Sequence, residues 1–319
     1  SGYKMLRFIK NLLTIDRQPR RGLLALEWAM LVYMLLTFVL IFFTYTKLQH
    51  PDAMIWGRVR IIAMTAMLWG AYRLLPCRLT LIARVAAQLA LLAWWYPDTY
   101  ELNRIFPNQD HLFAAWEQQL FGFQPAYTFC KAVPNAFFSE LMAMGYASYY
   151  PLIALTAGFY AAFRYDEFER ASFVIMGSFF LYYVIFVLVP VTGPQYYYGA
   201  IGLDHVANGI FPNVHDYFNT HQERLTCPGY SSGFFYHLVE NAHQAGERPT
   251  AAFPSSHVGI TTVLLLLAWH SRCKALFFTM LPFFILMCFA TVYIRAHYAI
   301  DAVAGLLTGG LFYFVLKKR

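Results

Sequence analysis

The segment "TVYIRAHYAID", residues 291–301, lies between two strongly apolar stretches near the end of the chain. "LPFFILMCFA" precedes it and "AVAGLLTGGLFYFVL" follows it. Both stretches belong to runs long enough to cross a bilayer as helices, which takes about 20 apolar residues. The segment therefore predicts a turn between two membrane-spanning helices. It carries Arg295, His297 and Asp301 in a setting where ionisable groups are expensive and by default functional.

The composition of the whole chain agrees with a membrane protein. Of its 319 residues, 59% are hydrophobic and only 13% are charged, whereas soluble domains carry about 25% charged residues. No residue cluster suggests a nucleic-acid-binding module, so we interpret the surplus of basic residues as topology signals. The five cysteines show no metal-ligand spacing. Cys130 and Cys227 could pair on an oxidising side, although free thiols are the expectation.

Apolar windows recur along the chain and predict eight spanning helices. An aromatic, amphipathic segment at residues 110–130 precedes the fourth of them, and we expect an interfacial or re-entrant helix there. The fold class is therefore all-α, a polytopic membrane protein with about eight transmembrane helices. The expected spans are residues 28–46, 59–75, 79–96, 141–163, 171–190, 255–270, 275–293 and 298–316.

Basic residues are distributed unevenly between the two sides that these spans define. With the N-terminus in the cytoplasm, most of the 24 lysines and arginines fall on the inner side, as the positive-inside rule requires. Both termini are then cytoplasmic. The long loop 191–254 and the starts of the sixth and eighth spans fall on the outer face.

His297 and Asp301 are four residues apart at the start of the last span, so they share one helix face. A carboxylate there can accept the imidazole Nδ1–H, which fixes the tautomer and leaves Nε2 as a nucleophile. Just upstream, the Arg295 guanidinium could hold phosphate oxygens in a bidentate fork. The alternative is structural: a snorkelling arginine, and a His–Asp pair that caps a helix.

A second motif, "FPSSHVGITT" (residues 253–262), begins the sixth span. Pro254 and Ser255 are typical of a helix start, with Ser255 as the N-cap. Backbone N–H groups at such an end bind anions, which makes Ser255 and Ser256 candidates for phosphate binding. His257 follows on the same outer face, where an ordinary interfacial histidine is the alternative interpretation.

A third motif, "PVTGPQYYYG" (residues 190–199), ends the fifth span. Proline and glycine break the helix, and three consecutive tyrosines are typical of a lipid–water interface. Gly193, Gln195 and Tyr196 are candidate contacts for a headgroup at this position.

The order and spacing of these motifs carry a resemblance. "PSSH" (254–257), followed by Arg295-x-His297-x-x-x-Asp301, is similar to the phosphatidic acid phosphatase type 2 superfamily. "YIRAHYAIDAVAG" more narrowly resembles the branch of inositol phosphorylceramide synthases and sphingomyelin synthases. The resemblance covers about residues 100–316. The apolar windows and basic residues divide the rest of the chain into a basic cytoplasmic tail (1–27) and N-terminal transmembrane helices (28–100). Residues 101–319 then form a catalytic membrane domain that resembles the family's six-helix core, with the outer loop 191–254.

This resemblance implies a mechanism without metal or cofactor. His297 attacks phosphorus and forms a phosphohistidine, while His257 protonates the leaving lipid alkoxide and then deprotonates the incoming hydroxyl. Asp301 orients His297 and stabilises its positive charge. The transition state is stabilised by Arg295 and by the backbone N–H groups of Ser255 and Ser256.

One departure from the family pattern bears on the substrate. Phosphatases of the superfamily carry a lysine and a distant Arg-Pro that bind phosphate, and this chain has Gln195 near such a position. A phosphomonoester carries close to two negative charges and a phosphodiester one, so a site short of cations favours a diester. Lys131, Arg224 and Arg248 remain alternative sources of charge.

The leading hypothesis is transfer of a phosphorylated headgroup between membrane lipids, from a phospholipid donor to a ceramide-like acceptor. A hydrolase acting on a lipid phosphate or pyrophosphate, with water as acceptor, shares every catalytic residue. A proton-relaying transporter would need polar residues within several spans, and few are evident. A catalytically inactive scaffold disagrees with the intact His257, His297 and Asp301.

The active site is expected on the non-cytoplasmic face, in a bacterial inner membrane or facing a Golgi or ER lumen. The oligomeric state is not assigned.

Half of the ten histidines lie in the outer loop. A metal site there is an alternative, but the spacings match no known ligand pattern, and we interpret the loop as a polar and aromatic lid. The residues concerned are His205, His215, His221, His237 and His243, with Asp204, Asp216 and Glu240 as further ligands.

Overall fold

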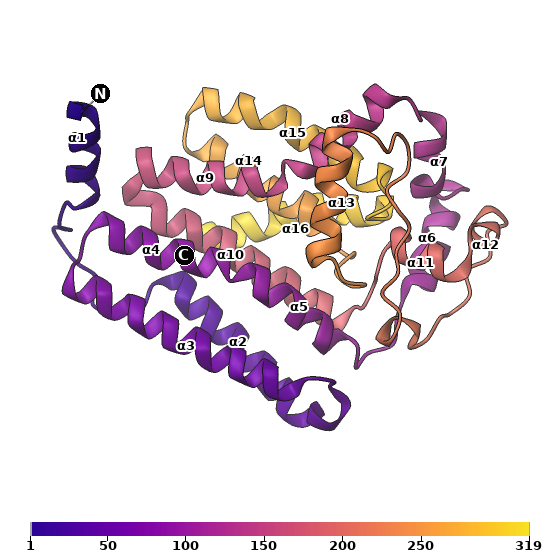
Figure 1. Ribbon diagram of the computed structural model, residues 1–319, viewed down its shortest axis with the longest axis horizontal. Coiled ribbons are helices and arrows are strands. Elements are labelled where there is room, and N and C mark those ends of the chain that lie inside the picture. The colour runs from indigo at the N-terminus through magenta and orange to yellow at the C-terminus, as the bar shows by residue number, and fades with distance from the viewer. Residues whose placement is uncertain (1, 319) are drawn as a thin grey trace.

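The computed structural model describes residues 2–318, with side chains from residue 6 onward. It is 74% helix, and no strand is formed in this part of the chain. The helices pack as an elongated bundle whose long axis is horizontal in Figure 1. The predicted all-α class is confirmed.

The first third of the chain forms a short basic helix followed by three long helical runs. The bounds are α1 (Gly2–Leu12), α2 (Ala25–Thr44) with the 3₁₀ turn η1 (Tyr45–Lys47), α3 (Pro51–Leu74), α4 (Arg78–Ala90) and α5 (Leu92–Asn103). Because only Leu91 separates α4 from α5, the two act as one long helical run.

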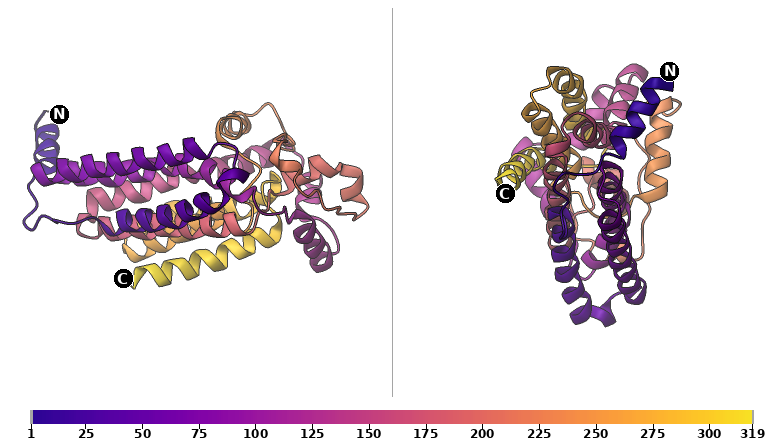
Figure 2. Two further views of the ribbon diagram at one scale, coloured as in Figure 1. Left: turned by 90° about the horizontal axis from the view of Figure 1, so that it is seen from below. Right: turned by 90° about the vertical axis from the view of Figure 1, so that its left-hand side faces the viewer.

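The predicted interfacial segment is a pair of short helices, α6 (Asp110–Phe121) and α7 (Pro125–Ala132). Gly122 ends α6 in the left-handed conformation, with φ 78°, which a side chain with a Cβ rarely adopts. Both helices lie at one end of the bundle, beside α11 (Figures 1 and 2).

Six further helices build the rest of the bundle. They are α8 (Ala136–Ala147), α9 (Tyr149–Phe163), α10 (Tyr165–Leu188), α14 (Ser256–His270), α15 (Lys274–Tyr293) and α16 (Ala299–Lys317). α14 and α16 approach closely because Gly259 faces Gly309, and Gly305 faces the carbonyl of Ser255; a Cβ on Gly305 or Gly309 would clash with the backbone of α14. Small residues permit such close helix contacts in membranes, and this contact brings the starts of the two helices together.

The outer loop is largely ordered into short helices: α11 (Pro194–Ile201), α12 (Leu203–Ala207), η2 (Tyr217–Asn219) and α13 (Phe234–Gly246). α11 and α12 lie at the end of the bundle away from both chain termini (Figure 2, left). α13 crosses the front of the bundle in Figure 1, near the starts of α14 and α16.

Five helical runs within the described residues are long and apolar enough to cross a membrane. The protein is thus a helical membrane protein, and the count of eight spans stays a prediction. The remaining expected spans correspond to α3, which carries several arginines, and to α9 and α14, which have 15 residues each. The five runs are Ala25–Lys47, Arg78–Asn103, Tyr165–Leu188, Lys274–Tyr293 and Ala299–Lys317.

The N-terminal helices contain two buried ion pairs that the apolar pattern did not reveal. Arg58 of α3 donates two hydrogen bonds of 2.7 Å to Asp98 of α5. Arg84 of α4 donates bonds of 2.9 and 2.6 Å to Glu27 of α2. All four side chains are at most 3% exposed. These helices are therefore more polar inside than the sequence suggested.

Candidate active site

The predicted catalytic histidines meet at one cavity. A volume of about 400 Å³ lies between α5, α9, α10 and α13 and the start of α14, and both His257 and His297 line it. Their ring centroids are 5.7 Å apart. The turn before α16 and the first residues of α14 are brought together by the glycine contacts between these helices.

His297 is held by a backbone carbonyl. It lies in the turn between α15 and α16, is 3% exposed, and its Nδ1 is 2.8 Å from the carbonyl oxygen of Ala252. A carbonyl only accepts hydrogen bonds, so Nδ1 carries the hydrogen and Nε2 keeps its lone pair. Burial lowers the pKa of His297 to about 4, and the ring is therefore neutral near pH 7.

The expected hydrogen bond between His297 and Asp301 is absent, which corrects the sequence analysis. Asp301 Oδ2 lies 3.7 Å from Nδ1, beyond hydrogen-bond range, because it accepts the Tyr298 backbone N–H at 2.8 Å. The other oxygen, Oδ1, is buried and has no partner among the described residues. Ala252 performs the orienting role predicted for Asp301, whose charge remains close enough to interact with a cationic ring.

His257 packs against two tyrosine rings at the start of α14. Tyr146 and Tyr149 lie against it with centroids 4.6 and 4.2 Å away. The prediction of Ser255 as N-cap is confirmed, since its Oγ accepts the Val258 N–H at 3.3 Å.

The two serines before His257 differ in what they offer to a ligand. The backbone N–H of Ser255 donates to the Asp301 carbonyl at 3.0 Å, so that donor is already occupied and ties α14 to α16. Ser256 lines the cavity and begins α14. Of the two predicted anion-binding positions, the structure exposes only Ser256 to the cavity.

Arg295 points away from the histidines. Its guanidinium donates to the Ala126 carbonyl at 3.3 Å and to Cys130 Sγ at 3.4 Å, and lies over the ring of Tyr127. It is not among the residues that line the cavity. In this arrangement Arg295 connects the turn to α7, and it would have to leave these partners to reach a phosphate between the histidines.

The candidate headgroup contacts after α10 also lie outside the cavity wall. Gly193 donates its N–H to Asp110 at 2.9 Å, and the Gln195 N–H donates to the Arg295 carbonyl at 2.7 Å. Tyr196 is 1% exposed. From this segment the cavity is lined by Thr192 instead. The backbone interactions indicate that the segment supports the Arg295 turn.

Two carboxylates of α6 hydrogen-bond to segments next to the cavity, the residues after α10 and the start of α16. Neither carboxylate was predicted from the sequence. Asp110 accepts the Thr192 N–H at 2.7 Å and the Tyr298 hydroxyl at 2.9 Å. Glu117 accepts the first two N–H groups of α16, from Ala299 and Ile300, at 2.8 and 3.0 Å. Burial raises the pKa of Glu117 to about 7, against the effect of these bonds. Two acidic residues seven positions apart in an aromatic amphipathic segment were the available signal.

Two ionisable residues of the outer loop, His243 and Glu247, line the cavity beside His257 and His297. His243 near the end of α13 is 4% exposed, and neither ring nitrogen has a partner in the described part of the chain. Glu247, directly after α13, accepts the Tyr96 hydroxyl of α5 at 3.3 Å. Their four-residue spacing was the only sequence signal for a shared helix face.

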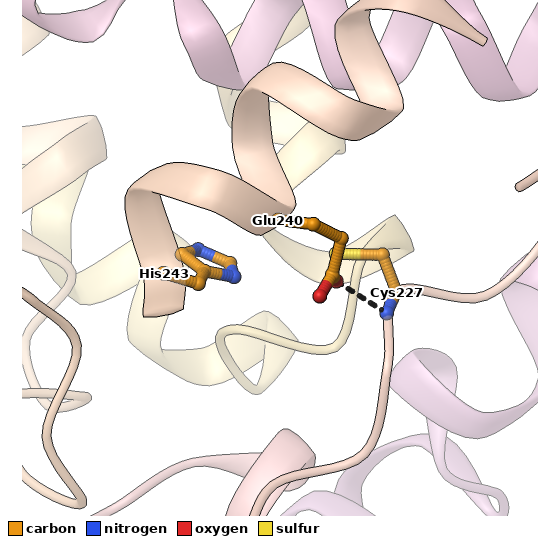
Figure 3. Close-up of side chains that lie close together, drawn as sticks. All are labelled: Cys227, Glu240 and His243. Atoms are coloured by element: carbon orange, nitrogen blue, oxygen red, sulfur yellow. Dashed lines mark hydrogen bonds between the residues drawn. The ribbon is translucent and has the colours of Figure 1, made fainter. Parts of the chain in front are cut away.

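His243 also belongs to a group that resembles a metal site. Its ring, Glu240 and Cys227 present ligand atoms within 4.8 Å of one another (Figure 3). Both oxygens of Glu240, however, accept the Arg224 guanidinium, at 3.1 and 2.6 Å, and one accepts the Cys227 N–H at 2.9 Å. Burial alone would raise the pKa of Glu240, but these bonds lower it to about 2. The ion pair accounts for the geometry, and its guanidinium opposes a metal cation.

The remaining histidines of the outer loop do not join this group. The five cysteines are all free thiols, so Cys130 and Cys227 are not paired. Among the described residues that line the cavity there is no lysine or arginine. The site thus combines three histidines, one carboxylate and several tyrosines.

Comparison with known families places this arrangement in context. A family model described as the PAP2 superfamily matches residues 110–315, more than half of the chain. The match contains His257, His297 and Asp301 and leaves out α1–α5. No curated protein and no solved structure matches the chain.

Proposed function

Since the chain belongs to the PAP2 superfamily, whose membership suggests lipid phosphatase or phosphotransferase activity, we propose a specific reaction. The protein is a membrane-embedded lipid phosphotransferase that moves a phosphorylated headgroup through a phosphohistidine on His297. Its reaction is that of an inositol phosphorylceramide synthase, from phosphatidylinositol to a ceramide-like hydroxyl.

The observation that carries this proposal is the neutral His297 at the cavity, with Nδ1–H directed to Ala252 and Nε2 free. A fixed tautomer presents one defined lone pair, as a nucleophile requires. His257 is on the same cavity, within reach of a leaving oxygen on the far side of phosphorus.

In the first step, Nε2 of His297 forms a bond to phosphorus and the bond from phosphorus to the diacylglycerol oxygen breaks. The oxygen takes the electron pair. Burial and the neighbouring His297 lower the pKa of His257, and the negative charge of the bound phosphodiester opposes this shift. His257, protonated in that complex, donates its proton to the oxygen, so diacylglycerol leaves as an alcohol. The phosphorylated imidazole becomes cationic, and the Asp301 carboxylate 3.7 Å from Nδ1 stabilises that charge.

In the second step, neutral His257 takes the proton of the acceptor hydroxyl. The acceptor oxygen forms a bond to phosphorus, the bond from Nε2 to phosphorus breaks, and the electron pair returns to the imidazole. Both histidines regain their initial protonation. No step requires a metal or cofactor.

The cavity supports a phosphodiester donor for two reasons. It has no guanidinium or ammonium group among its described lining residues, which favours one negative charge over two. Its lining includes Leu89, Leu92, Ile153 and Phe179, an apolar surface suited to lipid chains. Two of these residues come from α4 and α5, outside the family match.

We also propose that the reaction takes place on the non-cytoplasmic side of the membrane. α13 and the start of α14, which line the cavity, lie away from α1 and from the end of α16 (Figure 2). The basic residues of the chain favour a cytoplasmic position for both termini.

Product analysis by mass spectrometry tests the reaction. Purified protein is incubated with phosphatidylinositol, with and without ceramide, beside the His297→Ala variant. We expect diacylglycerol and inositol phosphorylceramide, both dependent on ceramide and absent from the variant. Release of phosphate from phosphatidic acid or a prenyl pyrophosphate, with no transfer product, would show a hydrolase that uses water.

A further inference from the structure

The cavity contains a second polar cluster that the proposed chemistry does not use. His243 and Glu247 both line it, together with His257 and His297. The ring of Tyr146 lies between the two clusters: it stacks on His257 at 4.6 Å and meets the edge of His243 at 5.4 Å. A group bound at His243 would therefore lie next to the reacting phosphate.

His243 has hydrogen-bonding capacity that the protein leaves unused. The side chain is 4% exposed, and neither Nδ1 nor Nε2 has a partner in the described residues. Burial, assisted by Arg224, lowers the pKa of His243 to about 4. The neutral ring offers one donor and one acceptor, and buried polar atoms of this kind are normally satisfied.

Glu247 adds a carboxylate with no cationic partner at the cavity. It accepts the Tyr96 hydroxyl at 3.3 Å, while Arg248 donates to the backbone carbonyl of Glu247 and not to the carboxylate. Burial raises the pKa of Glu247, and an anion bound beside it would raise that pKa further, so an anionic headgroup is disfavoured here. A carboxylate instead accepts hydrogen bonds from hydroxyl groups or attracts an ammonium group.

The two residues together discriminate between those ligands. A trimethylammonium group would suit Glu247 and the tyrosines, but it has no N–H or O–H group and would leave His243 unpaired. A polyol donates hydroxyls to Glu247, and both donates to and accepts from the neutral ring. Only the polyol satisfies the Glu247 carboxylate and both the donor and the acceptor nitrogen of His243.

We propose that His243 and Glu247 form the subsite for a neutral, hydroxyl-rich headgroup carried by the donor phosphodiester. The inference rests on the proposed function for its place in the reaction, but it concerns binding and is testable without turnover. Because Tyr96 of α5 supports Glu247, a helix outside the family match contributes to headgroup selection.

The test compares the binding of two lipids with the same acyl chains, phosphatidylinositol and phosphatidylmethanol, to the full-length protein in detergent. Wild type is expected to bind phosphatidylinositol at least about 10-fold more tightly, as hydrogen bonds to a charged and a buried group allow. Glu247→Gln and His243→Phe should each reduce this preference by about 10-fold or more, with phosphatidylmethanol binding unchanged.

Matched controls are Glu223→Gln and His237→Phe, whose side chains are exposed in the same loop and which should keep the wild-type preference. Equal binding of both lipids by wild type, stronger binding of phosphatidylcholine, or an unchanged preference in both variants would overturn the subsite. The wild-type comparison decides even if a variant fails to fold. Failure of transfer with the binding preference intact would reject the proposed function alone.

Discussion

In α2–α5 the buried charged side chains form hydrogen-bonded ion pairs, whereas the buried ionisable side chains around the cavity are not paired in this way. Arg58 and Asp98 make two hydrogen bonds of 2.7 Å, and the guanidinium lies over Trp95. His297 and Asp301 are just as buried, at 3% and 0% exposed, yet stand 3.7 Å apart without a hydrogen bond. Within each N-terminal pair the two charges neutralise each other, as a structural role inside a membrane requires.

The difference shows which buried polar atoms are available to bind a ligand. Around the cavity, Asp301 Oδ1 and both nitrogens of His243 have no partner in the described residues. Arg58 and Arg84 also leave one nitrogen each unpaired, but their other nitrogens bind a carboxylate in two places. Such groups cost stability unless a ligand satisfies them. Variants should therefore separate into two classes, one that loses stability and one that loses turnover.

The largest expected effect is on turnover. His297→Ala removes the proposed nucleophile and should lower kcat by about 10³-fold or more, with the melting temperature close to wild type. A matched control is His270→Ala at the far end of α14, where the ring pairs with Glu167. Activity of His297→Ala near that of the control would remove His297 as nucleophile.

The next effect is on stability. Asp98→Ala leaves the Arg58 charge buried and should destabilise the protein by about 3–5 kcal/mol, measured as a lower unfolding midpoint. The double variant Arg58→Met with Asp98→Leu should recover most of this loss, because it buries no charge. Asp52→Ala, exposed at the start of α3, the helix that carries Arg58, is the control. A mild effect of Asp98→Ala would contradict a structural role for the pair.

Asp301→Asn should lower turnover without lowering stability, the opposite of Asp98→Ala. The amide oxygen can still accept the Tyr298 N–H, and the Ala252 carbonyl still fixes the tautomer. The variant loses only the negative charge near the phosphorylated ring, so we expect a loss in kcat on the order of 10²-fold at unchanged stability. A loss equal to that of His297→Ala would mean that Asp301 also controls the tautomer.

The smallest effect is the pH dependence. Because burial lowers the pKa of His297 to about 4, the nucleophilic neutral form exists at every pH above that value. Acidification from pH 7 to 6 should therefore not lower kcat/KM through this group, and its loss should begin below about pH 5. A pH–rate profile that falls with a midpoint near 6.5 would indicate an ordinary, solvated histidine.

Much of the architecture was predictable, because apolar length and periodicity are local properties. The expected spans 141–163 and 298–316 correspond to α8–α9 and α16. The Ser255 cap follows from its local motif. The partners of Arg58 and Arg84 were not predictable, since 40 and 57 residues separate each from its carboxylate.

The site was predictable only in part, for the same reason. His257 and His297 were found from motifs, but the group that orients His297 is a backbone carbonyl, which has no sequence signature. The direction of Arg295 follows from its contacts with α7, not from its neighbours in the chain. Glu117 and Glu247 reach the site from elements whose positions depend on tertiary packing.

The central claim is a covalent phosphohistidine on His297, and trapping it is the most direct test. Purified protein is mixed with radiolabelled phosphatidylinositol without ceramide, quenched in alkali, and the labelled residue is mapped by mass spectrometry. We predict an acid-labile, alkali-stable adduct on His297 that ceramide discharges and that His297→Ala lacks. A labelled adduct that persists in His297→Ala, or turnover of wild type without any adduct, would contradict the account.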